Sequence, residues 1–258
     1  MSYEPALGAP ATPVIITGGA SGIGLASAEA LAAVGRPVAL WDINADGVEQ
    51  AAETLRSRYG VPIFATRADL RDLADIGRAL ADSRTALGSV GGIVHAAGTV
   101  DTASLDGITA QSWEDGIAVH LRALAFLVQG ALPDLAANAH SAVVAITSIN
   151  ATLGNAMNPI YSAAKGGMLS LVRSLADRLA RDGVRINSVS PGIIMTAMMK
   201  PAVDALPAGH FERRILQDRI GEPAEIGRVV RFLLSREASY VTAAEFVVDG
   251  GNISSQRG

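Results

Sequence analysis

The chain contains no cysteine among its 258 residues. Disulfide bonds, thiolate nucleophiles and zinc or iron–sulfur centres held by cysteine are therefore excluded. The four histidines, His95, His120, His140 and His210, are scattered and form no ligand spacing such as HExxH, so we expect no metal site. A chain without cysteine also suits a reducing compartment, and we expect a cytoplasmic protein.

Strong charge and long apolar runs are lacking as well. The net charge is −4 and no basic block is present, so nucleic acid is not an expected partner. No uninterrupted apolar run approaches the roughly 18 residues of a membrane span, and no membrane association is expected. The N-terminal MSYEPALGAPATP lacks the basic and apolar regions of a signal peptide, and we interpret residues 1–12 as a flexible lead-in.

What the chain does contain is a regular alternation of apolar runs and helical patterns. With 49% hydrophobic and 18% charged residues, the composition is typical of a packed globular core. The alternation predicts βαβ units, and hence a parallel sheet with helices on both faces. We expect a single doubly wound α/β domain of the Rossmann type over residues 13–258.

The expected elements are defined by short β-branched runs and by helical periodicity between Gly or Pro residues. The strands, some with their following turns, are expected at 14–17, 38–42, 62–68, 92–98, 142–147, 184–189 and 245–249. The helices are expected at 25–34, 44–59, 72–87, 110–137, 159–181 and 223–235, with an irregular segment over 196–222.

A glycine-rich turn follows the first strand. Gly18, Gly22 and Gly24 permit a tight turn and let the backbone approach a pyrophosphate, and the next helix presents its positive N-terminal end there. The spacing differs from GxGxxG, and a tight turn that binds no ligand is the alternative.

The second strand ends in Asp42. A carboxylate at this place can accept hydrogen bonds from the ribose hydroxyls of an adenosine, and it repels a 2′-phosphate. No Arg or Lys occurs in the five residues that follow to offset its charge. The sequence therefore predicts a preference for NAD(H) over NADP(H), with a solvated or capping Asp as the alternative.

The stretch from Ser148 to Lys165 carries the candidate chemistry. Ser148 follows an apolar strand, and Tyr161 and Lys165 share one helix face because they are four residues apart. An ammonium beside a phenol lowers the pKa of the phenol, which would make Tyr161 a proton donor and acceptor near neutral pH. The alternative is that Tyr161 and Lys165 simply share a solvated face.

Together, these residues resemble those of the classical short-chain dehydrogenases/reductases. The pattern Thr17-Gly18-x-x-x-Gly22-x-Gly24, then Ser148, then Tyr161-x-x-x-Lys165 is similar to that family's over nearly the whole chain. Further segments that are similar to the family's motifs are Asp69-Leu70, Ala96-Ala97-Gly98, Pro191-Gly192-x-x-x-Thr196 and Asp249-Gly250-Gly251.

The resemblance implies hydride transfer between a nicotinamide and a secondary alcohol or ketone. Tyr161 would be the general acid/base, Ser148 would hydrogen-bond the substrate oxygen, and Lys165 would lower the pKa of Tyr161 and bind the nicotinamide ribose. It also implies a homo-oligomer, usually a tetramer. The cofactor-binding residues would be Gly18, Ser21, Gly22, Ile23, Gly24, Asp42, Ile43, Asp69, Leu70, Ala96, Ala97, Gly98, Tyr161, Lys165, Pro191, Gly192, Ile194 and Thr196.

The chain departs from the family pattern at two histidines. His95 replaces the first Asn of the N-A-A-G turn, and His120 replaces the Asn that is thought to position a water relaying protons to the Lys. Histidine can also donate and accept, but it is larger and can become charged. We hypothesise that His120 is a fourth catalytic residue and that activity is retained with an altered pH dependence.

The substrate is expected between the residues after Ser148 and the irregular segment 193–217. Methionine adapts to apolar ligands, so its abundance there favours an apolar or variably shaped substrate, with ordinary core packing as the alternative. The predicted substrate residues are Asn150, Leu153, Met157, Met198 and Met199, and further candidates are Asn155 and Met195.

Two other functions stay open. One is reduction of a 3-oxoacyl thioester on an acyl-carrier protein, against which the negative charge and Asp42 argue. The other, supported by the two His replacements, is a dinucleotide-binding regulatory protein that has lost catalysis. A serine hydrolase is disfavoured, because Ser162-x-x-Lys165 has no S-D-N or K-T-G companion and no G-x-S-x-G occurs.

Overall fold

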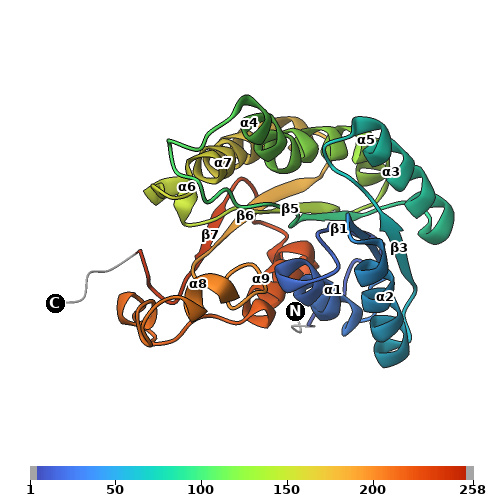
Figure 1. Cartoon of the computed structure of the whole chain (residues 1–258). Coiled ribbons are helices and arrows are strands. Elements are labelled where there is room, and N and C mark those ends of the chain that lie inside the picture. The colour runs from blue at the N-terminus through green and yellow to red at the C-terminus, as the bar shows by residue number, and fades with distance from the viewer. Residues whose placement is uncertain (1–4, 254–258) are drawn as a thin grey trace.

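The computed structural model describes residues 5–253, and a seven-stranded parallel sheet runs through the centre of this part (Figure 1). Its strand order is β3-β2-β1-β4-β5-β6-β7. The strands are β1 Val14–Thr17, β2 Val38–Asp42, β3 Ile63–Arg67, β4 Gly92–His95, β5 Ala142–Ile146, β6 Arg185–Pro191 and β7 Glu245–Val248. Each expected strand is confirmed. At most strand ends the observed boundary lies within one or two residues of the expected one.

Helices connect successive strands, as the βαβ pattern predicts. They are α1 Gly22–Ala32, α2 Ala45–Tyr59, α3 Leu73–Leu87, α4 Ala110–Ile117, α5 Ala123–Ala137, α6 Asn150–Leu153, α7 Pro159–Ala180, α8 Lys200–Asp204 and α9 Pro223–Leu234. The short helices α6 and α8 were not expected; α8 lies in the segment predicted to be irregular.

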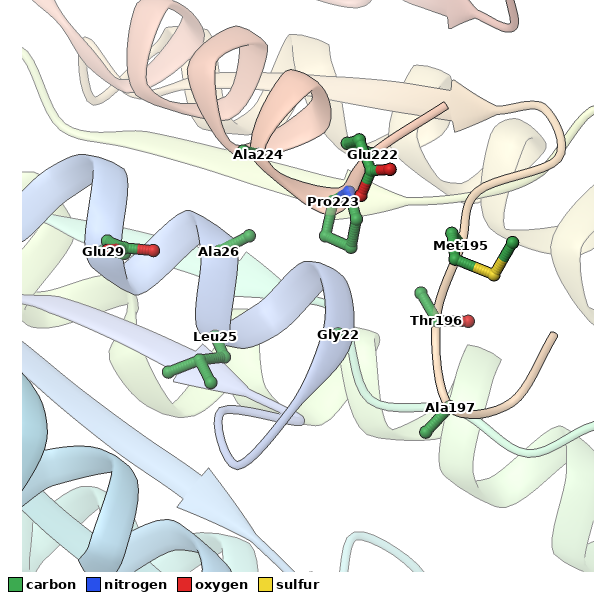
Figure 2. A pocket seen from close by; sticks show the side chains of 10 residues that line it. All are labelled: Gly22, Leu25, Ala26, Glu29, Met195, Thr196, Ala197, Glu222, Pro223 and Ala224. Carbon is green, nitrogen blue, oxygen red and sulfur yellow. The ribbon is translucent and has the colours of Figure 1, made fainter. Parts of the chain in front are cut away.

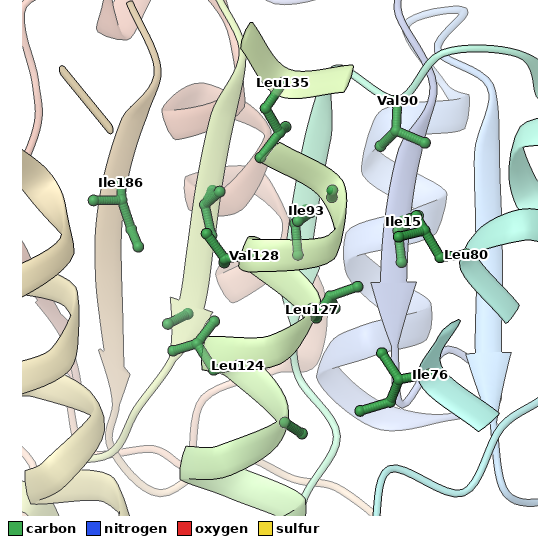
Figure 3. Packing of buried hydrophobic residues seen from close by; sticks show 14 of the residues in the cluster. Ile15, Ile76, Leu80, Val90, Ile93, Leu124, Leu127, Val128, Leu135 and Ile186 are labelled. Atoms are coloured by element: carbon green, nitrogen blue, oxygen red, sulfur yellow. The ribbon is translucent and has the colours of Figure 1, made fainter. Parts of the chain in front are cut away.

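Alternate strand residues build the two halves of the core. Ile15 faces α3, α5 and α7, whereas its neighbour Ile16 faces α1, α2 and α9. Figure 1 shows these two helical layers above and below the sheet. Figure 3 shows the first half, in which Leu124 and Leu127 of α5 pack over strand residues such as Ile93. The doubly wound Rossmann-type fold is thus confirmed.

The chain reverses its direction of strand addition between β1 and β4. In such sheets a crevice opens at the carboxyl ends of these two strands, and ligands bind there. Gly18 follows β1 with φ of 71°, and a Cβ on it would lie 2.9 Å from the backbone of Ala97. Glycine is required at this position because the two turns approach so closely.

The single helix expected over 110–137 is interrupted. A π-helical turn, η1 Ala118–Arg122, separates α4 from α5, and the N–H of Ala123 donates to the carbonyl of Ala118. A π turn adds one residue, and such turns are frequent at functional sites. The segment Ala110–Ala137 is long and apolar enough to span a membrane by length and composition alone. Its apolar side, however, packs on the sheet, which accounts for that composition.

The lead-in expected over residues 1–12 contacts the body of the domain from Ala6 onward. The N–H of Ala6 donates to Glu237 Oε1 at 2.8 Å, and the N–H of Arg236 donates to the carbonyl of Ala9 at 2.7 Å. Buried Arg36 donates to the carbonyl of Thr12. These bonds hold residues 6–12 in place, and residues 1–4 lie outside the described part.

Candidate active site

Ser148, Tyr161 and Lys165 meet at the carboxyl end of β5. Ser148 follows the strand, and Tyr161 and Lys165 occupy the first two turns of α7. Ser148 lies close enough to the Tyr161 hydroxyl to lower the pKa of the phenol. Lys165 Nζ donates to the carbonyl of Ile146 at 2.6 Å and lies 5.5 Å from the centroid of the Tyr161 ring. The structure therefore brings the three predicted catalytic residues together, and their roles stay predictions.

The expected lowering of the Tyr161 pKa is wrong for this structure. Burial raises the pKa of Tyr161 above its usual value, and the nearby Ser148 side chain offsets this only in part. Burial also lowers the pKa of Lys165 to about 7. Lys165 Nζ donates to the carbonyl of Ile146, and Lys165 does not counter the effect of burial on the pKa of Tyr161.

His120 lies against Tyr161. Its ring meets that of Tyr161 edge to face, with centroids 5.5 Å apart. Its Nε2 lies 2.9 Å from the carbonyl oxygen and 3.2 Å from the amide nitrogen of Thr99, so the tautomer decides whether it donates or accepts. Nδ1 is buried and has no hydrogen-bond partner among the described residues.

His120 is held in the neutral state. Its pKa is well below the usual value, first because of burial and then because of the charge of Lys165. The possibility that His120 becomes charged, raised by the residue type, therefore does not apply near neutral pH. Any part that it takes in proton transfer has to be that of a neutral imidazole.

His95 is a residue whose role the sequence did not reveal. The Thr17 hydroxyl accepts the N–H groups of Ala96 and Ala97, both at 3.2 Å, so its proton is free for His95 Nδ1 at 3.0 Å. His95 Nε2 then donates to the carbonyl of His120 at 2.9 Å. The imidazole of His95 is thus hydrogen-bonded to the backbone carbonyl of His120, which links the two unusual histidines. Burial lowers the pKa of His95 to about 4, which keeps it neutral.

The start of α1 fits a dinucleotide phosphate. Ser21 makes no side-chain cap within the described part of the chain, and the first intrahelical bond runs from the Leu25 N–H to the Ser21 carbonyl. The N–H groups of the first turn therefore point out of the helix. By contrast, Asn44 caps α2 and Asp72 caps α3. An uncapped N-terminus beside a crevice is suited to an anion.

Glycines allow close contacts around the glycine-rich turn and the start of α1, which together we call the cradle. A Cβ on Gly24 would lie 2.0 Å from the carbonyl oxygen of Gly18, and one on Gly22 would lie 3.4 Å from Thr196 Cγ2. Predicted cofactor residues from α1 and from the chain after β6 thus face one another. Of the other predicted cofactor residues, Ser21 and Ile23 lie at the start of α1, and Ala96 and Ala97 follow β4.

A cavity of about 370 Å³ adjoins the cradle (Figure 2). Figure 2 shows Gly22 on one side and Thr196 on the other, with Pro223 at the start of α9. Met195 and Glu29 also line it. The cavity contains two of the predicted cofactor residues and lies between α1, residues 195–197 and the start of α9.

Asp42 is held at the end of β2 by two backbone groups. Its Oδ2 accepts the N–H of Ala20 at 3.1 Å and its Oδ1 accepts the N–H of Asn44 at 3.0 Å. Ile43 beside it is exposed. Arg67, which the sequence reasoning did not consider, is paired in register with Asp42 on β3. Its Nη1 lies 3.7 Å from Asp75 rather than on Asp42.

The remaining predicted cofactor residues follow β3, β4 and β6 at the same edge of the sheet. Asp69 is bound by Arg71, whose hydrogen bonds hold the pKa of Asp69 below its usual value, and Leu70 is buried. A Cβ on Gly98 would lie 2.3 Å from the His120 ring. Pro191 ends β6, and the N–H of Gly192 donates to the carbonyl of Val248 at 3.0 Å. Ile194 is buried two residues further on.

The predicted substrate residues lie mainly on the surface. Leu153 on α6, Met157 before α7 and Met198 before α8 are all more than half exposed, so core packing does not account for them. Met199 is partly buried, and its N–H donates to Thr196. The N–H of Asn150 donates to Ser148 Oγ at 3.1 Å, which helps to fix that hydroxyl.

The chain matches known proteins over most of its length. A family model described as "Enoyl-(Acyl carrier protein) reductase" matches residues 18–252. The chain is 34% identical over 241 residues to a probable galactose dehydrogenase of Rhizobium meliloti (strain 1021), covering 92% of this chain and 93% of that protein.

Solved structures show the same fold. A short-chain dehydrogenase/reductase from Brucella melitensis, described as a glucose/ribitol dehydrogenase, has a TM-score of 0.89 at 30% identity and covers 95% of this chain and 98% of its own. L-sorbose reductase from Gluconobacter frateurii, in complex with NADPH and L-sorbose, has a TM-score of 0.91 at 25% identity and covers 97% and 99%.

The lowered pKa of Lys165 makes a prediction about stability. Between about pH 7 and the ordinary lysine pKa of 10.5 the unfolded chain holds a proton that the folded chain does not, so raising the pH in this range favours folding. Relative to Lys165→Met, wild type should gain up to about 1.4 kcal/mol of unfolding free energy per pH unit. Urea denaturation at several pH values above neutrality measures this gain.

Lys200→Met is the control, because Lys200 is exposed and paired with Asp204 on α8. Its difference from wild type should stay nearly constant over the same range. If the gap between wild type and Lys165→Met is also constant, Lys165 has an ordinary pKa in the folded protein.

Proposed function

The chain belongs to the short-chain dehydrogenases/reductases, a family of oxidoreductases that act on alcohols and ketones, and from this we propose that it transfers a hydride between NAD(H) and a secondary alcohol or ketone. The observation that carries the proposal is the partly buried Tyr161, which lies beside Ser148, Lys165 and His120.

A nicotinamide would supply or accept the hydride, and the chain's own residues would manage the proton. Reduction of a ketone builds negative charge on its oxygen, which needs a hydrogen-bond donor at once. In the proposal Tyr161 gives its proton to that oxygen and Ser148 orients it. The raised pKa of Tyr161 keeps the phenol protonated, which supports the reductive direction near neutral pH.

The proposed substrate is an uncharged secondary alcohol or ketone. No Arg or Lys lies between Ser148 and Tyr161 to bind a phosphate or a carboxylate. The exposed Leu153, Met157 and Met198 would supply apolar contacts, with the segment 193–217 as the second wall. The sugars named for two of the similar proteins, galactose and L-sorbose, are uncharged and belong in the first assay panel.

Reduction of the 3-oxo group of an acyl thioester is the second candidate. The description of the matching family model supports only the carrier-bound acyl substrate, since an enoyl reductase acts on a carbon–carbon double bond. The net charge of −4 is unfavourable for docking an acidic carrier protein. Turnover of an acetoacetyl thioester that exceeds that of every free alcohol and ketone would replace the first proposal. If the protein binds NADH tightly but turns over neither acyl thioesters nor free alcohols and ketones, the result would favour the dinucleotide-binding regulatory protein.

For assembly, we propose a homotetramer that works in the cytoplasm. Trp113 on α4 and Phe126 on α5 are each about two-fifths exposed, which favours a covered surface on these helices. Light scattering on the pure protein gives the number of subunits.

The proton donor is tested by Tyr161→Phe. Loss of the hydroxyl should lower kcat by about 10²–10⁴-fold, because no other phenol lies at Ser148 in the described structure. Dinucleotide affinity, followed by fluorescence titration, should change by less than about twofold, since the ring is kept. Tyr240→Phe, at a fully exposed tyrosine, is the control. Full activity of Tyr161→Phe would remove Tyr161 from the reaction.

The substitution His120→Asn tests whether His120 acts as a fourth catalytic residue. The smaller side chain admits solvent beside Tyr161, and because burial is what raises the pKa of Tyr161, that pKa should fall. The pH–rate profile should therefore move toward lower pH. His140→Asn is a matched control, because His140 is exposed and its positive φ of 64° is tolerated by Asn. An unchanged profile for His120→Asn would show that His120 has no part in proton transfer.

Asp42→Asn tests the choice of dinucleotide. Wild type should favour NAD over NADP, and removal of the carboxylate charge should shift the ratio of kcat/KM values toward NADP by about tenfold or more. Arg67, paired in register with Asp42, would then face the 2′-phosphate, so Arg67→Ala in the same chain should cancel the gain. Asp46→Asn, at an exposed neighbour, is the control. Equal use of both dinucleotides by wild type would contradict the role of Asp42.

A further inference from the structure

The helix that carries Tyr161 is not capped in the usual way. Asn158 precedes it and is a residue type that commonly caps, but its side chain makes no capping bond within the described residues. Pro159 at the first helical position has no N–H to satisfy. The first bond inside the helix runs from the N–H of Ser162 to the carbonyl of Asn158 at 2.9 Å. The N–H groups of Ile160 and Tyr161 therefore need partners from elsewhere.

Both partners are oxygens of a single carboxylate, that of Asp101. Its Oδ1 accepts the N–H of Tyr161 at 2.9 Å, and its Oδ2 accepts the N–H of Ile160 at 3.3 Å. Asp101 lies in the loop after β4, about sixty residues before the helix that it caps. A negative charge at a helix N-terminus also interacts favourably with the helix dipole. The side chain of Asp101 thus accepts the two backbone N–H groups that need partners in the first turn of α7.

The contact is reciprocal. The Asn158 side-chain amide, which is not used for capping, donates to the carbonyl oxygen of Asp101. Close by, Ser104 Oγ donates to the carbonyl of Ala156 at 3.0 Å. The loop and the start of α7 are therefore joined by bonds in both directions, and the loop is fixed on the helix rather than merely resting on it.

The same loop holds His120 at its other end. Thr99, two residues before Asp101, presents both backbone groups to His120 Nε2. The segment from Thr99 to Asp101 thus bonds the two residues whose rings meet edge to face, His120 and Tyr161. Their separation depends on the length of this short backbone bridge.

We propose that Asp101 is a positioning residue, which sets the place of Tyr161 against His120 by capping the catalytic helix from the loop after β4. Among the described residues Asp101 makes no hydrogen bond to the phenol oxygen or to the glycine-rich turn, so it acts through the backbone of the first turn of α7. Its effect on turnover rests on the proposed function, whereas its effect on the placement of Tyr161 does not.

The physical reason is that Tyr161 lies in the first turn of its helix. First turns fray when their N–H groups are unsatisfied, and a reacting group that moves by about 1 Å can lose roughly 10²-fold in rate. A tyrosine deeper in the helix would be held by intrahelical bonds on both sides. At its actual position the backbone N–H of Tyr161 depends on Asp101.

The experiment compares Asp101→Ala, Asp101→Asn and Asp106→Ala. Asp101→Ala removes both acceptors, whereas Asp101→Asn keeps one acceptor oxygen and serves as the conservative rescue. Asp106 lies in the same loop and is exposed, so its replacement controls for general loosening. Hydrogen exchange of the Ile160 and Tyr161 amides, the nuclear Overhauser contact between the Tyr161 and His120 rings, dinucleotide affinity and kcat are measured for each.

For Asp101→Ala we expect exchange at both amides to be faster by about tenfold, the ring contact to weaken, and kcat to fall by about tenfold or more. Dinucleotide affinity should stay within about twofold, because Asp42 and the turn at Gly18–Gly24 are untouched. Asp101→Asn should fall between Asp101→Ala and wild type in every readout, and Asp106→Ala should match wild type.

Several outcomes would overturn the proposal. Unchanged amide exchange in Asp101→Ala would show that the cap does not hold the helix. Faster exchange with an unchanged ring contact would show a cap without positioning. An equal loss in Asp106→Ala would assign the effect to the loop as a whole. If wild type turns over no substrate, the proposed function has failed, and exchange and ring contact alone decide whether Asp101 positions Tyr161.

Discussion

The hydrogen bond from His95 to the carbonyl of His120 joins the sheet to the interrupted helix beside the active site. The accepting carbonyl, that of His120, lies within the π turn at 118–122. Thr17 fixes the tautomer of His95, because its hydroxyl accepts two backbone N–H groups and has only its own proton to give. The placement of His120 against Tyr161 follows from this chain of bonds.

The ionisable groups around Tyr161 are governed by burial more than by mutual attraction. Burial raises the pKa of Tyr161, lowers that of Lys165 to about 7 and lowers those of both histidines. Each shift favours the uncharged form, as expected for a site of low polarity. In the proposed reduction, uncharged donors beside Tyr161 would stabilise the charge that develops on a substrate oxygen.

Much of the fold and part of the candidate site could be predicted from the sequence, because these features depend on local patterns. Apolar runs such as Val14–Thr17 alternate with helical periods, and i, i+4 spacing places Tyr161 and Lys165 on one face. The π turn escaped prediction because nothing in the run of apolar residues around His120 marks an added residue. The pKa of Tyr161 was predicted in the wrong direction, because sequence spacing indicates the neighbouring charge but not the depth of burial or the carbonyl that Lys165 binds.

The sequence by itself determined the doubly wound sheet, the glycine-rich turn and the set Ser148, Tyr161 and Lys165, because each follows from residue type and short-range spacing. Only the tertiary structure decided the pairings of His95 with His120 and of Asp101 with Tyr161. Those contacts join residues far apart in the chain, and they exist because adjacent parallel strands bring their following loops to one edge of the sheet. Neither histidine nor Asp101 carries a local signal of its partner.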